Sequence, residues 1–294
     1  PRKSEAELLP EDTLVEGVHF FSDDPLETVG RKLVRVNVSD IFAKGGAPKW
    51  ASLALTWPTS RNRSEIQAFA NGLGKDLAAF GISLVGGDTT STPGPLTLSL
   101  TLHGLCSGRG PVRRSGARVG DDLWVSGRIG DGYLGLKATL GQLEIGSEEA
   151  LRGLVECYRV PSIPDKQIAE LVSRFSTASL DISDGLLADA DHLAVASGVR
   201  VNIDQHLIPL SDVAKRYVGQ VAADRLLELL SGGDDYQALF CVPETKREAI
   251  ESQIARSGLH LTRIGNVVEG TGVYLKSSGG GWEPAPKSGW KHFK

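Results

Sequence analysis

The sequence predicts an α/β protein built from two domains, and three observations support this. The chain has 294 residues, against roughly 150 for a typical domain, and hydrophobic residues make up 40% of it. Alternation typical of strands and spacing typical of helices occur in both halves. A polar stretch rich in Arg and Gly, residues 108–120, separates the halves, and we expect domains at 1–115 and 116–294.

The first half predicts a sheet that is covered by helices. Leucine at every second position of residues 96–102 indicates a strand with one buried face, and residues 52–57 alternate in the same way. Apolar residues between Ile66 and Phe80 follow helix spacing, with Ser64 as the expected N-cap. Helices must cover one face of each strand, so this half reads as an α/β layer. The predicted elements are strands at 12–20, 52–57 and 96–102 and helices at 29–36 and 64–80.

The second half mixes both kinds of element and predicts a second α/β domain. Its periodicity predicts helices at residues 148–158, 165–175, 186–196, 223–230 and 245–257. It also predicts strands at residues 122–126, 177–182, 199–203, 237–242, 260–268 and 272–276.

The composition excludes several classes of protein. The net charge is −4 and no segment is strongly basic, so we expect no nucleic-acid partner. No apolar run reaches about 18 residues and no secretory signal is visible, so we expect neither a membrane span nor export. Three cysteines are too few and too scattered for a disulfide framework or a zinc site. We therefore expect a cytoplasmic protein.

The chain contains no Met and begins at Pro1. A chain of this length ordinarily carries several Met residues. We therefore expect that residues are missing from the sequence, at least at its N-terminus.

Five aspartates beside small residues, at expected element ends, are candidate metal ligands: Asp12, Asp40, Asp88, Asp181 and Asp184. An aspartate in a turn often only bonds its own backbone. The Gly-Gly-Asp-Thr-Thr run around Asp88 suggests more, because its glycines let backbone N–H groups approach an anion and its side chains offer oxygen ligands. Asp181 and Asp184 are expected at the end of a strand, where both carboxylates can face one cleft.

A converging group of such carboxylates requires cations. Two like charges about 4 Å apart repel by about 4 kcal/mol at an effective dielectric of 20. Oxygen ligands favour Mg²⁺ or Ca²⁺ over zinc, and Mg²⁺ commonly bridges carboxylates to substrate phosphates. The sequence therefore predicts a magnesium–nucleotide site.

Residues 130–135 match G-x-G-x-x-G after a predicted strand, a pattern typical of dinucleotide-binding turns. Glu156 lies about 20 residues further on, where the ribose-binding acid is expected, but within a helical pattern. The alternative is an ordinary Gly-rich strand–helix turn. The chain contains no Walker A motif, no protein-kinase motif set and no G-x-S-x-G elbow.

Four further residues are candidates with plainer alternatives. Arg114 can reach a phosphate bidentately or can be a solvated linker charge. His19 is either a ligand contact or a structural histidine. Asp234 belongs to an acidic pair that forms either a turn or a loop feeding acids to a site. Trp290 near the C-terminus either anchors the tail or stacks on a ring.

Taken together, the motifs resemble the thiamine-monophosphate kinase family of the aminoimidazole ribonucleotide synthetase-like superfamily. The run D-T-L-V-E-G-V-H-F and the run D-I-S-D-G-L are specific to this kinase within the superfamily. The matching runs keep the family's order over nearly the whole chain. They lie at residues 12–20, 37–40, 84–89, 114–117, 181–186 and 232–236.

The resemblance implies a role for each matching residue. The five aspartates match the family's ligands for several Mg²⁺ ions, and Asp184 and Arg114 are the expected catalytic residues. The expected ATP contacts are Gly87, Asp88, Arg114 and Ser183. The expected thiamine-phosphate contacts are His19, Asp234 and Trp290, although the family commonly has Glu where this chain has Asp234. Family members also carry hydroxyl residues just before Asp12 and an Asp-bearing segment upstream, where this chain has Glu11, Pro10 and a short stub.

The resemblance also implies a fold and a reaction. We expect an N-terminal domain that closes a dimeric β-barrel with a second copy, and a C-terminal α/β domain that completes the site. The implied reaction is direct transfer of phosphate from ATP to thiamine monophosphate, giving thiamine diphosphate. Rival predictions are another ATP-dependent reaction of the superfamily, a dinucleotide oxidoreductase and a non-catalytic ligand sensor.

Overall fold

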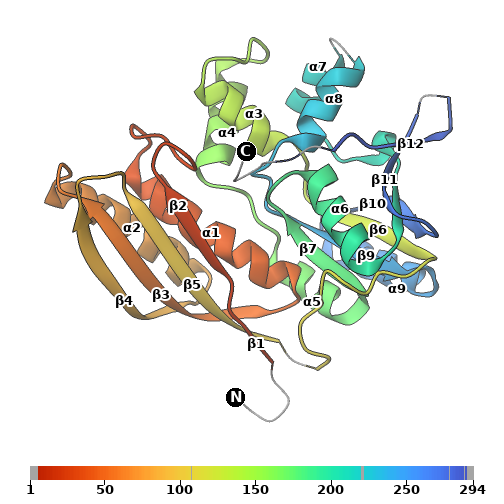
Figure 1. The fold of residues 1–294 in the computed structure, drawn as a ribbon, viewed down its shortest axis with the longest axis horizontal. Helices are drawn as coiled ribbons and strands as arrows, with labels where there is room; N and C mark the ends of the chain where they lie inside the picture. Colours follow the sequence, from red (N-terminus) through yellow and green to blue (C-terminus); the bar gives the residue numbers. More distant parts are fainter. Residues whose placement is uncertain (1–5, 107, 220–221, 278, 288, 290–294) are drawn as a thin grey trace.

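The computed structural model describes residues 6–106, 108–219, 222–277, 279–287 and 289. Its strands form two sheets, one of five strands in the first half of the chain and one of seven in the second (Figure 1). The described residues 108–120 between them contain no helix or strand. The predicted α/β architecture in two parts is therefore confirmed.

The first sheet is layered against two helices. Its strand order is β1-β5-β3-β4, with β2 also paired to β5. The elements are β1 (Ala6–Leu8), β2 (Glu11–Val15), α1 (Leu26–Ala43), β3 (Ala47–Pro58), α2 (Arg63–Ala79), β4 (Ser83–Thr92) and β5 (Thr97–Cys106). Leu98, Leu100 and Leu102 are buried beneath α1 and α2, as their alternation predicts.

The second sheet is covered on both faces. Its order is β12-β11-β8-β10-β6-β9-β7. Its strands are β6 (Asp121–Ser126), β7 (Ala178–Ile182), β8 (Arg200–Ile203), β9 (Gln237–Pro243), β10 (Leu261–Val268), β11 (Gly272–Lys276) and β12 (Trp282–Pro284). Alternate residues of β9 enter two different cores, with Leu239 in the core beneath α6 (Leu186–Ser197) and Phe240 in the core beneath α5 (Lys166–Phe175) and α9 (Arg247–Ser257).

A third group of helices lies beside this sheet at the top of Figure 1. It consists of α3 (Asp131–Thr139), α4 (Glu148–Arg159), α7 (Asp212–Gly219) and α8 (Ala222–Ser231). Leu134, Leu154 and Tyr217 share its small core. Two short 3-10 turns complete the structure, η1 (Gln205–Leu207) and η2 (Glu244–Lys246).

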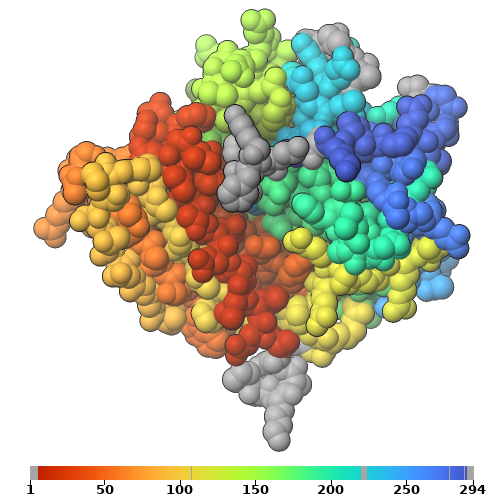
Figure 2. Space-filling model, in the orientation of Figure 1, coloured from red at the N-terminus to blue at the C-terminus, as the bar shows by residue number. Residues whose placement is uncertain are grey.

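Helix α1 joins the two halves. It packs on α2 and β5 and also contacts α5, β7 and β9 of the second half. The space-filling view shows the first half in contact with the second half above and below the grey atoms on this face of the molecule (Figure 2). Polar residues at the end of α1 are therefore held against the end of β7.

Several local predictions are wrong. The strand predicted over 12–20 ends at Val15, because the chain turns through Gly17 at a φ of 80°. The N-cap of α2 is Asn62 and not Ser64; the Asn62 side chain accepts from the N–H groups of Ser64 and Glu65. Strands β1, β4 and β12 and helices α3 and α7 were not predicted.

None of the helices in the described part of the chain has the length and apolar character needed to cross a membrane. All three cysteines are free thiols.

Candidate active site

A cavity of about 610 Å³ lies where β2 and the turn after it meet the loops of the second half. Five predicted site residues line it: Asp12, His19, Ser183, Asp184 and Asp234. They come from segments far apart in the sequence, so the fold, and not the local chain, assembles this site. Phe21, Tyr133 and Tyr158 add aromatic surface to its wall.

Three of the predicted metal ligands converge beside this cavity. Asp12 projects from β2, Asp40 from the last turn of α1, and Asp181 from the end of β7. Ser39 Oγ donates to Asp181 Oδ2 over 3.2 Å, which ties α1 to β7. Asn37 Oδ1 accepts from the backbone N–H of Asp12 over 3.2 Å, which ties α1 to β2.

The three carboxylates disfavour one another's charge. Burial and then Asp181 raise the pKa of Asp12 to about 7. Burial and then Asp12 raise the pKa of Asp40 to about 6. Burial and then Asp40 raise the pKa of Asp181 to about 8. Without a cation these buried carboxylates therefore keep protons near neutral pH, and a bound cation would stabilise their charged forms.

Two cations partly offset this charge. Lys44, just after α1, donates from Nζ to the carbonyl oxygen of Ser179 over 2.7 Å. Burial lowers the pKa of Lys44, while Asp181 and Asp40 oppose that shift. Arg114 is near enough to Asp40 to lower the pKa of that carboxyl. Sequence reasoning identified Arg114 and missed Lys44, whose proximity to Asp181 arises only when α1 packs on β7.

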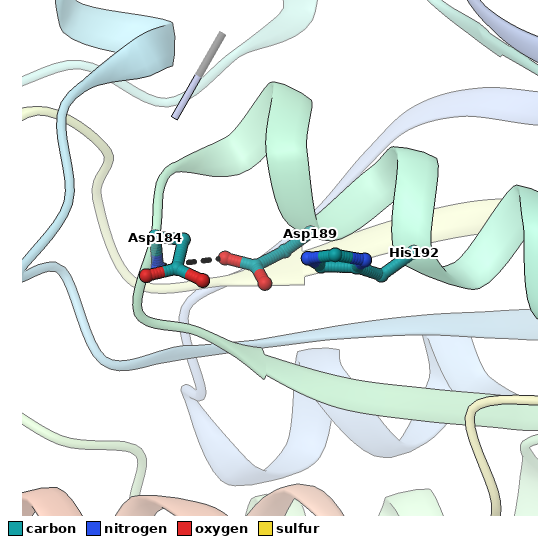
Figure 3. A group of neighbouring side chains, drawn as sticks. All are labelled: Asp184, Asp189 and His192. Carbon is teal, nitrogen blue, oxygen red and sulfur yellow. Dashed lines mark hydrogen bonds between the residues drawn. The ribbon is translucent and has the colours of Figure 1, made fainter. Parts of the chain in front are cut away.

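The loop between β7 and α6 carries Ser183 and Asp184. Asp189 Oδ2, one turn into α6, accepts from the backbone N–H groups of both residues over 3.0 Å each. Figure 3 shows the Asp189 carboxylate turned back toward Asp184, with His192 beside it on the same helix. Burial and then Asp181 raise the pKa of Asp189 to about 8. Sequence reasoning missed Asp189, which fixes the loop in place.

The donor set fits a hard divalent cation. Asp12, Asp40, Asp181 and Asp184 offer only oxygen atoms, and burial and then mutual repulsion raise the pKa of the first three. The ligand atoms of Asp184, Asp189 and His192 lie within 4.8 Å of one another. Such a set suits Mg²⁺ and does not suit zinc, which favours nitrogen and sulfur. The arrangement can therefore hold a cation together with an anionic ligand in the adjoining cavity.

The structure does not bring Asp88 to this cluster. Asp88 lies inside β4 and not at an element end. Across the sheet, Asp88 is aligned through β3 and β5 with Thr13 of β2, so the two side chains project from the same face. Asp12 is the neighbour of Thr13 in β2 and pairs with buried Leu100. Because successive residues of a strand alternate between faces, Asp12 and Asp88 project from opposite faces of the sheet. Three strand spacings of about 5 Å also separate β2 from β4.

Gly87 lies beside Asp88 on the same outer strand. A Cβ at Gly87 would lie 2.1 Å from the backbone oxygen of Leu53, so glycine permits the pairing of β4 with β3. Like Asp88, it faces solvent in the single chain and lies away from the cavity.

The predicted thiamine-phosphate contacts lie partly within this site. His19 and Asp234 line the same cavity, one from each half of the chain. His19 Nδ1 accepts from the backbone N–H of Val15 over 3.0 Å, which orients the ring. Trp290 lies outside the residues that the structure describes.

The G-x-G-x-x-G segment forms the strand–helix turn that leads into α3. Gly130 N–H donates to both oxygens of buried Asp235, over 2.9 and 2.8 Å, and Gly132 N–H donates to Oδ1 over 3.2 Å. A pyrophosphate bound at this turn would need these same donors. The geometry therefore favours the ordinary turn over a dinucleotide site.

A second cavity of about 1020 Å³ shares Asp234 with the first. Its other carboxylates are engaged: Asp235 by the glycine N–H groups, Asp131 by Ser211 Oγ over 2.6 Å, and Asp165 by Gln167 N–H over 2.8 Å. No predicted metal ligand lines it. The smaller cavity beside the carboxylates is therefore the candidate active site.

Comparison with known proteins shows the family to which both halves of this chain are similar. The family model for the AIR synthase related protein, N-terminal domain, matches residues 2–106, and the model for its C-terminal domain matches residues 118–277. A thiamine-monophosphate kinase from Caulobacter vibrioides is 39% identical over 287 residues, which are 97% of this chain and 80% of the relative.

Solved structures show the same fold. A structure described as AaThiL complexed with AMPPCP and TMP matches with a TM-score of 0.86 and 35% identity, covering 100% of this chain and 89% of that chain. Thiamine-monophosphate kinase from Stenotrophomonas maltophilia K279a matches with a TM-score of 0.85 and 34% identity, covering 97% and 88%.

Proposed function

Since this chain belongs to the thiamine-monophosphate kinase family of AIR synthase-related proteins, we propose that it passes phosphate from ATP directly, in line, to thiamine monophosphate. The reaction is the ATP-dependent formation of thiamine diphosphate. The observation that carries the proposal is the adjacency of the carboxylate cluster to the cavity that holds His19 and Asp234. A relative of the same fold binds AMPPCP and TMP together, as a kinase for this pair requires.

The acceptor is itself a phosphate, which determines what the residues must do. Its second pKa is near 6, so the acceptor is largely a dianion at neutral pH and needs no general base. The obstacle is the approach of two polyanions, and positioning with charge neutralisation is the usual source of phosphoryl-transfer catalysis. Arg114 and Lys44 are the cations placed for this role. A phosphorylated enzyme trapped during turnover would contradict direct transfer.

We assign the metal-binding role to Asp12, Asp40, Asp181 and Asp184. Mg²⁺, when bound, neutralises phosphate charge and aligns the reacting groups. Ser183 contacts ATP and Asp184 acts with Arg114 in catalysis, while Asp189 holds the loop that carries Ser183 and Asp184.

His19 and Asp234 are the proposed contacts to thiamine monophosphate, with Trp290 as a third. Thiamine carries a cationic thiazolium ring and an amino-substituted pyrimidine. Aromatic faces bind such cations and carboxylates accept from such amines. The cavity supplies both kinds of group, with Tyr133 and Tyr158 beside Asp234.

We further propose a homodimer in which Asp88 and Gly87 serve the partner's site. Within one chain the first sheet is open, and its outer strand β4 exposes Leu84 and Val85. A long exposed edge with apolar side chains is a template for pairing with another chain. Association through this edge would close the predicted barrel and bring Asp88 to a second carboxylate cluster.

The domain boundary between residues 115 and 116 and the cytoplasmic location stay predictions. Three free thiols agree with a reducing compartment.

The test of the proposed function is an assay with ATP, Mg²⁺ and thiamine monophosphate, with the product identified by chromatography. We expect ADP and thiamine diphosphate in equal amounts. Free thiamine and formylglycinamidine ribonucleotide serve as control acceptors, and neither should support ADP release. ADP formation with an acceptor other than thiamine monophosphate would contradict the assignment.

A further inference from the structure

Lys32 is a buried lysine that the proposed reaction does not use. Its side chain is 2% exposed, although lysine is almost never fully buried without a partner. It projects from α1 toward the second half of the chain, where its ammonium meets Asp234 and Tyr158. Lys32 therefore contacts residues from both halves of the chain at the proposed substrate site.

The ammonium makes two hydrogen bonds and one cation–π contact with the protein. Nζ donates to Asp234 Oδ2 over 3.3 Å and to the carbonyl oxygen of His19 over 3.2 Å. It also lies 4.0 Å from the centre of the Tyr158 ring, a cation–π distance. The buried ammonium is therefore held by contacts within the protein, with its charge offset by the Asp234 carboxylate.

Asp234 is held from its other side as well. Tyr236 Oη donates to Asp234 Oδ1 over 2.8 Å. The φ angles of Asp234 and Tyr236 are 69° and 50°, a strained conformation for residues with side chains. The backbone N–H groups of the same two residues donate to the carbonyl oxygens of Ser183 and Ile182, over 3.0 and 2.7 Å. The loop is therefore fixed against the segment that carries Ser183.

These contacts leave Asp234 oriented but not saturated. Each carboxylate oxygen accepts one bond from the protein and keeps a second lone pair. The side chain is 28% exposed and lines the cavity, so those lone pairs are accessible to an amine or a cation. The positive charge of Lys32 also balances the carboxylate where solvent is scarce.

We propose that Lys32 is a positioning residue for thiamine monophosphate: it holds Asp234 and the His19 turn, one from each half of the chain, in their substrate-binding places. The inference rests on the proposed function, because it takes thiamine monophosphate as the ligand of Asp234. ATP binds beside the carboxylate cluster, which Lys32 does not contact. Lys32 therefore sets affinity for the acceptor and leaves affinity for ATP unchanged.

The experiment compares Lys32→Met with the wild type by steady-state kinetics and by calorimetric titration of thiamine monophosphate. We expect KM and Kd for thiamine monophosphate to rise about tenfold or more, with KM for ATP within about twofold. The control is Arg31→Met, which removes a neighbouring cation of α1 that pairs with Asp76 of the first half at 3.2 Å and reaches Glu156 of the second half only at 4.0 Å. That variant should lose stability but keep both KM values.

A double variant separates positioning from a general structural role. If Lys32 acts through Asp234, Lys32→Met should change KM for thiamine monophosphate by less than about threefold in an Asp234→Asn background. An equal factor in both backgrounds, or an unchanged KM in the single variant, would overturn the inference. Should Lys32→Met fail to fold, Lys32→Arg, which keeps the charge but changes the reach and geometry of the donors, takes its place in the same cycle.

The failure of this inference differs from failure of the proposed function. Wild-type enzyme that binds thiamine monophosphate without turnover would overturn the kinase proposal alone, and the titrations would still test Lys32. Normal wild-type turnover with a KM that is insensitive to Lys32→Met would overturn the role of Lys32 alone.

Discussion

Asp181 interacts with each of the other members of the carboxylate cluster. It interacts with Asp12 and Asp40 across the junction of the two halves and is bonded by Ser39. An amide in its place keeps the shape but loses the charge that would hold a cation. Its role as a ligand and its role in the fold can therefore be separated by one substitution.

We predict that Asp181→Asn lowers kcat at least about 100-fold, because loss of a direct metal ligand exceeds the effect of an outer contact. The protein should stay folded, with an unchanged circular dichroism spectrum, since the neutral amide also relieves repulsion. Asp212→Asn is the control, as that side chain is 88% exposed. Turnover near the wild-type value in Asp181→Asn would remove this residue from the site.

Residue types and short motifs were enough to predict part of this site. Asp12, Asp40 and Asp181 were chosen from their small neighbours and their order along the chain, and the structure brings them together. Lys44 and Asp189 were missed, because a single charged residue in a helical pattern normally indicates a solvated face. Their contacts arise only from tertiary packing.

At the scale of elements, β4 shows what periodicity leaves out. The run Gly-Gly-Asp-Thr-Thr reads as a turn, since glycine and aspartate are depleted in strands. The segment is nevertheless extended and pairs in parallel with β3 from Trp50 to Pro58. Long helices and alternating leucine strands could be predicted because each buries one face within its own half. The residues of β4 are exposed in the single chain, so they show no alternation of apolar and polar residues from which a strand could be predicted.

The exposed apolar residues of β4 lead to a prediction about self-association. We predict that Val85→Lys weakens the proposed homodimer, because a lysine at an exposed strand edge opposes pairing with another chain. Sedimentation velocity over a range of concentrations measures the change. Val195→Lys is the matched control, since Val195 is also an exposed valine but lies on α6. A dimer that is equally stable in both variants would place the interface elsewhere.

At the scale of the whole molecule, the junction between the halves carries the charge that makes stability depend on pH. Burial and mutual repulsion raise the pKa values of Asp12, Asp40 and Asp181 to about 7, 6 and 8, above the ordinary value of about 4. The folded chain therefore keeps protons that the unfolded chain has released. The contribution of these three groups to the free energy of unfolding is complete below about pH 4, and it is lost as the pH rises through 6 to 8.

We predict that the metal-free protein has a lower Tm at pH 8 than at pH 5.5, measured by calorimetry in a chelator. Mg²⁺ should raise Tm more at pH 8, because protons compete with the cation for the same carboxylates. The difference between the two pH values should shrink in Asp181→Asn, which removes one of the three groups. A metal-free Tm that is equal or higher at pH 8 would contradict this account of the cluster.

Asp88 lies away from the carboxylate cluster of its own chain, so a role for it in the site requires a second copy of the molecule. Asp88 and Asp12 project from opposite faces of a sheet and lie three strands apart, so they cannot bind one ion within a single chain. If both residues are needed for activity, the missing proximity must come from a second copy. A two-fold symmetric dimer would then contain two sites, each built from both chains.

Mixing two inactive variants tests this arrangement. We predict that Asp88→Asn and Asp181→Asn are each inactive alone, and that a mixed dimer regains one complete site from the intact Asp88 of one chain and the intact Asp181 of the other. Random reassociation of equal amounts makes half of the dimers mixed, so about a quarter of wild-type activity should return. The measurement is thiamine diphosphate formation after the two variants are unfolded and refolded together, with each variant refolded alone as the control. If Asp88 served the site of its own chain, both sites of every mixed dimer would lack one carboxylate, and no activity would return.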